Sequence, residues 1–202
     1  MNGSDAFLLS DKILDTLQFS TTEDDYTWSS SNLEKKLNNN IYNNDSIFTQ
    51  EQRAAIKKTA VENKKNPRYP ETTEDGITTM DYIFVLSMDE VLNPDYGFRP
   101  DIRVSNTRAA KITRYADEYG EYTDSNGYGQ YWLRTVGGRG KAVSIVDNGD
   151  ENGLIEIGGK NPTFTYGVRP ALHIDLSKGG WSYAGAVDSN GNTAPGRIAD
   201  IE

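Results

Sequence analysis

Cysteine is absent from the 202-residue sequence, and histidine occurs once, as His173. Without thiols the chain can form no disulfide, no cysteine-ligated zinc site and no cysteine nucleophile. No apolar run approaches the ~20 residues that span a bilayer, so we expect no membrane insertion. The first residues do not resemble a charged and apolar leader, and we expect that any leader is missing from this sequence.

The sequence also lacks an excess of basic residues. It has 21 Lys and Arg residues and 30 Asp and Glu residues, which gives a formal net charge of −9. Nucleic-acid phosphates are bound by clustered Lys and Arg, and anionic lipid surfaces attract the same residues. The composition therefore argues against nucleic acid and membrane surfaces as partners. A hydrophobic content of 36%, with plentiful Gly, Asn, Asp and Tyr, is typical of a loop-rich fold.

The strongest β-strand pattern lies in the C-terminal half of the chain. Three apolar and aromatic runs predict strands at 131–134, 142–146 and 154–157. The last two are expected to form a hairpin through the Asp-, Asn- and Gly-rich residues 147–153. Residues 166–176 alternate, which predicts one half-buried strand whose apolar face carries Val168, Pro170, Leu172, Ile174 and Leu176. Pro170 indicates an edge position or a bulge in that strand.

Helical patterns precede this region. Apolar residues at spacing four, after serines that can cap a helix, predict one helix with Leu33, Leu37 and Ile41 on its inner face. Thr49 and Gln52 form a capping box that opens a second helix. The apolar run 82–86 predicts a buried strand, and a second capping box, Ser87 to Glu90, predicts a short helix after it.

The patterns in the remaining segments are consistent with a single domain. A short strand or strand pair is expected at 7–9 and 13–14, and an exposed loop is expected over 63–79. A further helical stretch ends near Tyr119. We expect one domain over residues 1–177, followed by a loop-rich extension over 178–202.

A set of motifs in a fixed order carries a resemblance to a known family. The motifs are Trp28-Ser29-Ser30, Leu33-Glu34-Lys35-Lys36-Leu37-Asn38, Phe48-Thr49-Gln50-Glu51, Asp81-Tyr82-Ile83-Phe84-Val85-Leu86-Ser87, Thr113-Arg114-Tyr115-Ala116, Tyr131-Trp132-Leu133-Arg134-Thr135 and Gly167-Val168-Arg169-Pro170-Ala171-Leu172. In combination they resemble a functionally uncharacterised domain family common in surface and secreted proteins of Gram-positive bacteria. The resemblance covers roughly residues 6 to 176.

That family is in turn distantly similar to C-type-lectin-like folds, such as the formylglycine-generating enzymes, which also end with a Gly-x-Arg strand after a Trp-bearing strand. The similarity implies an α+β domain with a small twisted antiparallel sheet, flanked by two or more helices and carrying long loops. It also implies an extracellular or cell-surface location, in a larger multidomain protein. The formylglycine-generating activity does not carry over, because it resembles a cysteine-and-copper mechanism and this chain has no cysteine.

The candidate catalytic and metal-binding residues have simpler structural interpretations. His173 and Asp175 share a strand face, but the sequence has no Gly-x-Ser-x-Gly nucleophile motif, so we favour a structural histidine and no enzyme activity. Because the chain has no thiol and only one histidine, a metal site would have to use oxygen ligands, which leaves calcium as the candidate metal. We expect no other cofactor. The calcium candidates are Asp147, Asp150 and Asn152, but turns prefer the same residue types. The clusters 124–127 and 188–191 have the same two interpretations.

Aromatic residues in the C-terminal half give the better indication of binding. Tyr and Trp interleaved with Gly, Ser and Asn are typical of adaptable binding loops and also stack on sugar rings. The candidate ligand-binding residues are Tyr122, Tyr128, Arg134, Trp181 and Tyr183. Trp132 is expected in the core, and Arg169 is expected to tie strands together through carbonyls or a carboxylate.

The sequence thus predicts a non-enzymatic, extracellular binding or adhesion module whose partner is a glycan or a protein. Two alternatives stay open. One is a carbohydrate-active hydrolase that uses a pair of carboxylates, whose separation the sequence does not give. The other is a structural spacer domain. An exposed aromatic patch would favour binding, and a cleft with two carboxylates, one with a raised pKa, would favour the hydrolase.

Overall fold

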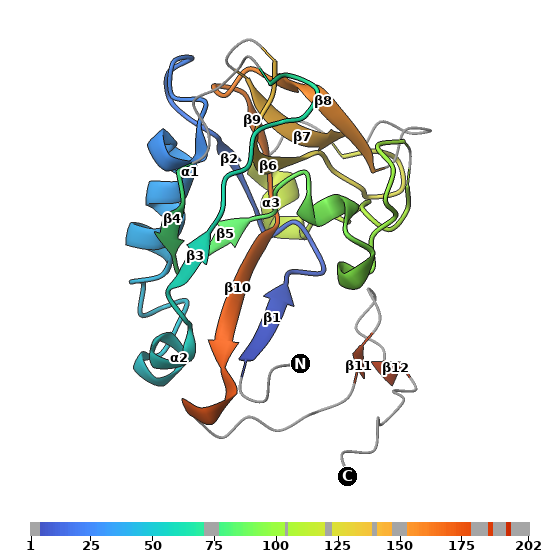
Figure 1. The fold of residues 1–202 in the computed structure, drawn as a ribbon. Coiled ribbons are helices and arrows are strands. Elements are labelled where there is room, and N and C mark those ends of the chain that lie inside the picture. The colour runs from blue at the N-terminus through green and yellow to red at the C-terminus, as the bar shows by residue number, and fades with distance from the viewer. Residues whose placement is uncertain are drawn as a thin grey trace.

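The computed structural model describes residues 5–70, 77–103, 105–119, 123–138, 141–146, 153–178, 186–187 and 193–194. These residues form an α+β fold with mostly antiparallel sheets and few helices (Figure 1). Where one sheet was expected, the strands form two main sheets and two short ladders.

The larger sheet holds four strands of the C-terminal half and one strand from the N-terminal region. Its order is β2 (Asp15–Gln18), β9 (Thr165–Val168), β6 (Tyr131–Val136), β7 (Ala142–Val146) and β8 (Leu154–Lys160). All neighbours are antiparallel except β6 and β9, which are parallel. The predicted strands at 131–134, 142–146 and 154–157 are therefore confirmed, while residues 147–152 of the predicted hairpin connection lie outside the described residues.

The smaller sheet places the last long strand between two others. Its order is β1 (Asp5–Leu9), β10 (Pro170–Asp175) and β5 (Phe84–Val85). The short ladders pair β3 (Thr59–Val61) with β4 (Thr79–Asp81), and β11 (Ala186–Val187) with β12 (Thr193–Ala194). The strands near the N-terminus do not pair with each other as expected, because β1 pairs with β10 and β2 pairs with β9.

The prediction of one continuous strand over 166–176 is wrong. The chain leaves the larger sheet after Val168 and enters the smaller one at Pro170, with Arg169 between them. Pro170 is not on an edge strand; it is the first residue of the central strand β10, a position where a missing N–H is tolerated. The predicted apolar face is therefore wrong in part: Val168, Ala171 and Ile174 are buried, whereas Leu176 is exposed.

A glycine permits the close contact between β9 and the start of β6. A Cβ atom at Gly167 would lie 2.6 Å from the carbonyl oxygen of Gln130 and 2.6 Å from Cγ2 of Ile13. The Gly167 amide also donates to that Gln130 carbonyl at 2.8 Å. Any side chain here would therefore push the two strands apart, which explains the glycine in the Gly-Val-Arg-Pro motif.

The first two helices are short and lie beside the β3–β4 ladder (Figure 1). The first begins at the cap Ser31 as α1 (Asn32–Lys35) and continues as a π-helical segment, η2 (Lys36–Ile41), with Leu33 and Leu37 buried. The capping box of Thr49 and Gln52 opens α2 (Gln50–Ala55), as predicted. The remaining helical segments are η1 (Trp28–Ser30), η3 (Glu90–Leu92), η4 (Pro94–Tyr96), α3 (Arg114–Tyr119) and η6 (Leu176–Lys178).

The core joins the two sheets and the first helix. Trp132 is fully buried, as predicted, and its indole N–H donates to the carbonyl of Leu17 at 2.9 Å. The run 83–86 is buried throughout, although only Phe84 and Val85 have strand pairing. None of the helices in the described part of the chain is long and apolar enough to cross a membrane.

Candidate functional site

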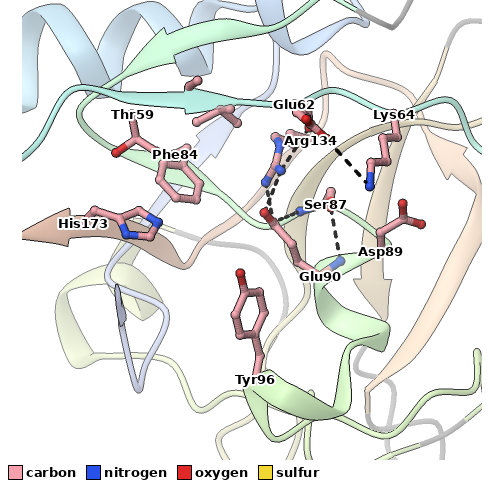
Figure 2. Close-up of a pocket in the computed structure, with 12 residues that line it drawn as sticks. Thr59, Glu62, Lys64, Phe84, Ser87, Asp89, Glu90, Tyr96, Arg134 and His173 are labelled. Atoms are coloured by element: carbon pink, nitrogen blue, oxygen red, sulfur yellow. Dashed lines mark hydrogen bonds and ion pairs between the residues drawn. The ribbon is translucent and has the colours of Figure 1, made fainter. Parts of the chain in front are cut away.

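A polar cavity of about 260 Å³ opens where β3, β5, β6 and β10 approach the segment 87–96 (Figure 2). We call it the Glu90 pocket. Its charged and aromatic lining residues are Glu62, Lys64, Phe84, Asp89, Glu90, Tyr96, Arg134 and His173. These residues come from both main sheets, from the segment after β3 and from residues 89–96, so only the folded chain brings them together.

An ion pair holds the carboxylate of Glu90 in this pocket. The guanidinium of Arg134 donates from Nη1 to Oε2 at 2.5 Å and from Nη2 to Oε1 at 2.8 Å. The same two nitrogens also donate to the carbonyls of Val85 and Glu62, at 2.8 and 3.2 Å. The Arg134 side chain is only 3% exposed, whereas that of Glu90 is 24% exposed. Arg134 therefore orients the carboxylate, and Glu90 presents it to solvent.

The second capping box also positions Glu90. The Ser87 amide donates to Glu90 Oε2 at 2.8 Å, and the Glu90 amide donates to Ser87 Oγ at 3.2 Å. The box predicted from sequence is thus confirmed at the start of η3. Its carboxylate caps the helix and lines the cavity at the same time. Sequence reasoning singled out Arg134 but missed Glu90, although the box was the signal that could have identified it.

Aromatic rings form the wall opposite the carboxylate. Phe84 and His173 lie with ring centroids 6.1 Å apart, and Phe7 stacks on Tyr96 with centroids 5.0 Å apart. Figure 2 shows the Tyr96 hydroxyl pointing into the space between His173 and Glu90. Burial raises the pKa of Tyr96 above its ordinary value, and the charge of Glu90 adds to this, so the hydroxyl keeps its proton at neutral pH.

The single histidine belongs to this wall. Burial lowers the pKa of His173 below its ordinary value, with Asp5 opposing the shift and Lys57 adding to it. The imidazole is therefore mainly neutral at pH 7. Asp175, the suggested partner for a hydrolase, accepts hydrogen bonds from the Ser177 amide and hydroxyl at 2.9 and 2.6 Å. Those bonds lower its pKa and stabilise it as a carboxylate at the end of β10.

The described residues also contain a carboxyl pair outside this pocket. Asp81 is buried and accepts hydrogen bonds at 2.7 Å from the Trp28 indole N–H and from the Thr79 hydroxyl. Burial and the neighbouring charge of Asp81 raise the pKa of Glu34 above its ordinary value. Neither carboxyl group lines the Glu90 pocket, so the acid with the raised pKa and the polar cavity are separate features.

The predicted site residues do not form one cluster. Arg134 lines the Glu90 pocket, whereas Tyr128 lines a second cavity, together with Lys111 and Arg169. The other candidates lie outside the described residues: Tyr122, Trp181, Tyr183, Asp147, Asp150 and Asn152. Arg169 donates from Nε to the Ser10 carbonyl at 2.8 Å, which confirms its predicted strand-tying contact.

Within the described ranges, no group of three or more His, Asp and Glu residues is arranged to hold a metal ion. One predicted calcium or turn cluster, residues 124–127, is a turn. The Asp124 carboxylate accepts from the amides of Asn126 and Tyr128, both at 2.8 Å, and Gly127 has a φ of 82°. The cluster at 188–191 lies outside the residues for which a structure is given.

Comparison with protein families identifies the class of this α+β domain. The chain belongs to the family described as a domain of unknown function (DUF6273), whose model matches residues 3–176. The match ends at the residue after β10, so it includes both main sheets and the Glu90 pocket. No curated protein and no solved structure matches the chain.

Proposed function

We propose that the chain is a carbohydrate-binding module and that the Glu90 pocket is its binding site. The observation that carries the proposal is the fixed Glu90 carboxylate opposite the wall that the exposed Tyr96 ring and His173 present. Arg134 and the Ser87 amide hold the carboxylate in place, so little freedom is lost when a ligand binds.

The chemistry of this pocket is complementary to a sugar ring. Sugar hydroxyls donate hydrogen bonds to carboxylates, which are strong acceptors, and the apolar face of the ring packs against aromatic side chains. The Tyr96 hydroxyl and the ammonium of Lys64 supply donors from the same lining. Polar groups from several segments thus converge on one cavity, and the rings of Tyr96 and His173 supply its aromatic part. The volume of about 260 Å³ lies just below the usual range, which favours one sugar unit or the end of a chain.

The wider proposal concerns where this binding takes place. We propose a C-type-lectin-like arrangement of sheets and loops and an extracellular or cell-surface location, within a larger bacterial surface protein. The motif resemblance described above supports both points. Tyr122, Trp181 and Tyr183 stay predicted ligand-binding residues, and Asp147, Asp150 and Asn152 stay calcium candidates beside their interpretation as turn residues; all six lie outside the described residues.

A glycan array followed by calorimetry with the strongest-binding neutral oligosaccharide tests the proposal. Tyr96→Ala and Glu90→Gln should each weaken binding about tenfold, because each removes a group that faces the ligand. Phe164→Ala is the matched control, since Phe164 is an exposed aromatic residue that does not line the pocket. Equal affinities for the wild type and both pocket variants would overturn the proposal, as would the absence of any glycan ligand.

One observation favours the hydrolase as the second candidate, because Glu90 and Asp89 both line the cavity. Glycoside hydrolysis uses two carboxyl groups on opposite sides of the scissile bond. Chromatography of the bound oligosaccharide after long incubation separates the two functions. New reducing ends that disappear with Glu90→Gln and Asp89→Asn would favour the hydrolase, whereas an intact ligand supports the binding module.

A further inference from the structure

A second polar cavity, of about 240 Å³, lies where the segment after β1 meets residues 106–111 and Tyr128. We call it the Lys111 pocket. Its charged residues are Lys111, Arg169 and Asp11, and the side chains of Asn106, Thr107 and Tyr128 complete its polar lining. Two cations face one carboxylate here, in a chain whose net charge is −9. The local charge therefore has the opposite sign to that of the whole chain.

The backbone fixes the position of Lys111. Lys111 and Tyr128 form an antiparallel bridge, and the Ile13 amide donates to the Lys111 carbonyl at 2.9 Å. The Lys111 ammonium lies 5.6 Å from the centroid of the Tyr128 ring, within the range of a cation–π contact. The ring holds the ammonium beside the cavity while leaving its N–H donors available to a ligand.

Arg169 is fixed at the junction of β9 and β10. It donates from Nε to the Ser10 carbonyl at 2.8 Å and from Nη1 to the Tyr131 hydroxyl at 3.3 Å, and its guanidinium lies 5.6 Å from the Tyr131 ring centroid. All of these partners are uncharged. Among the described residues, neither Lys111 nor Arg169 makes an ion pair with a carboxylate within 4.0 Å.

We propose that the Lys111 pocket binds the oxyanion of a small polar ligand, either a carboxylate or a phosphate. Lys111 and Arg169 supply the positive charge and the N–H donors, and oxyanions form their strongest hydrogen bonds with such cations. Asp11 leaves a net positive charge and accepts a hydrogen bond from a hydroxyl group of the same ligand. This site is independent of the Glu90 pocket and stands whether or not that pocket binds carbohydrate.

Three related sugars test the proposal by NMR titration of the full chain. D-glucuronate carries a carboxylate, glucose 6-phosphate carries a phosphate, and glucose carries no charge. Saturable shifts of the Lys111 and Tyr128 amide signals are expected with one or both anions and not with glucose. The anion that binds more tightly identifies the natural source of the oxyanion. Raising the salt concentration should weaken binding, because salt screens partly exposed charges.

Substitution of Lys111 distinguishes binding at a specific site from nonspecific attraction of anions to the positive charges of the protein. Lys111→Met removes the charge while keeping an unbranched side chain, and it should weaken anion binding about tenfold or more, the scale of one hydrogen bond to a charged group. Lys111→Arg should retain most of the affinity. Lys141→Met is the control, since it removes the same charge at an exposed position outside the pocket, and it should bind like the wild type.

The outcomes that would overturn the proposal are equal shifts with glucose and both anions, no shifts with either anion, or unchanged affinity in Lys111→Met with a wild-type thermal transition. The readout is distinct from that of the Glu90 pocket, where His173 reports on occupancy. A failure of neutral glycan binding at His173 therefore leaves the anion site untouched, and the reverse also holds.

Discussion

The two pockets use arginine in opposite ways. In the Glu90 pocket, Arg134 is buried and binds the Glu90 carboxylate with both terminal nitrogens, so its charge is neutralised inside the fold. In the Lys111 pocket, the bonds of Arg169 go to the Ser10 carbonyl and the Tyr131 hydroxyl, which are uncharged. The first pocket therefore presents a carboxylate held by a cation, and the second presents cations. The role of each arginine therefore depends on its bonding partner, which a distant segment of the chain supplies.

The largest expected effect tests this comparison directly. Arg134→Met should destabilise the protein by about 3–5 kcal/mol, because it leaves the half-buried Glu90 carboxylate without its cation. Arg169→Met should cost only about 1–2 kcal/mol, the scale of a hydrogen bond with a neutral group plus a cation–π contact. Urea unfolding followed by circular dichroism measures both values. Equal losses would contradict the different roles assigned to the two arginines.

A smaller effect separates the ligands of the two pockets. Tyr96→Phe removes one hydroxyl from the Glu90 pocket and should weaken neutral glycan binding by about 0.5–1.5 kcal/mol, the net value of one hydrogen bond. Anion binding at the Lys111 pocket should not change, because Tyr96 is not part of its lining. Calorimetry with a neutral oligosaccharide and with D-glucuronate provides the two affinities. A matched loss for both ligands would show that the pockets are coupled or that the fold is disturbed.

Glu34 differs from Glu90 because its charged neighbour is another carboxylate, Asp81, and not an arginine. Because the pKa of Glu34 is raised in the folded state, its protonation favours folding below about pH 4.5 and this contribution is lost as pH rises through the folded-state pKa. Glu34→Gln should therefore stabilise the protein at pH 7, by up to about 1 kcal/mol, since the amide donates to Asp81 without carrying charge. Thermal unfolding at pH 4 and pH 7 checks this. A variant that is less stable than wild type at pH 7 would refute it.

The smallest effect concerns the protonation of His173. Its pKa is lowered in the folded state, so the neutral imidazole contributes to the free energy of unfolding above about pH 6.5. This contribution is lost as pH falls through the folded-state pKa. The chain has one histidine, so a single imidazole signal follows this titration by NMR without assignment problems. A midpoint above that of a histidine in a model peptide would show that the imidazole is not buried in the aromatic wall.

The sequence predicted the features that depend on local pattern. The capping boxes at Thr49 and Ser87, the strands after Tyr131 and the buried position of Trp132 were all expected and are present. These features depend on residues one to four positions apart, whose side chains and backbone groups interact within one segment of the chain.

Features that depend on contacts distant in sequence were missed. Arg169, at the break between β9 and β10, bonds to the Ser10 carbonyl 159 residues away, and the half-buried Glu90 carboxylate bonds to Arg134, 44 residues away. Arg108 is fully buried and donates to the carbonyls of Arg99 and Gly153, both at 2.8 Å, yet nothing in its neighbouring sequence marks it as a core residue. Neither pocket could be assembled from sequence, because strand pairing decides which of these residues meet.

The most direct test of the central claim is the imidazole signal of His173 during titration with a neutral oligosaccharide that the chain binds. Because His173 is the only histidine and lines the Glu90 pocket, its signal reports on that pocket alone. We expect a saturable shift in the wild type and in Phe164→Ala, with a midpoint about tenfold higher in Glu90→Gln. Binding by calorimetry without any change in the His173 signal would place the glycan elsewhere and contradict binding in the Glu90 pocket.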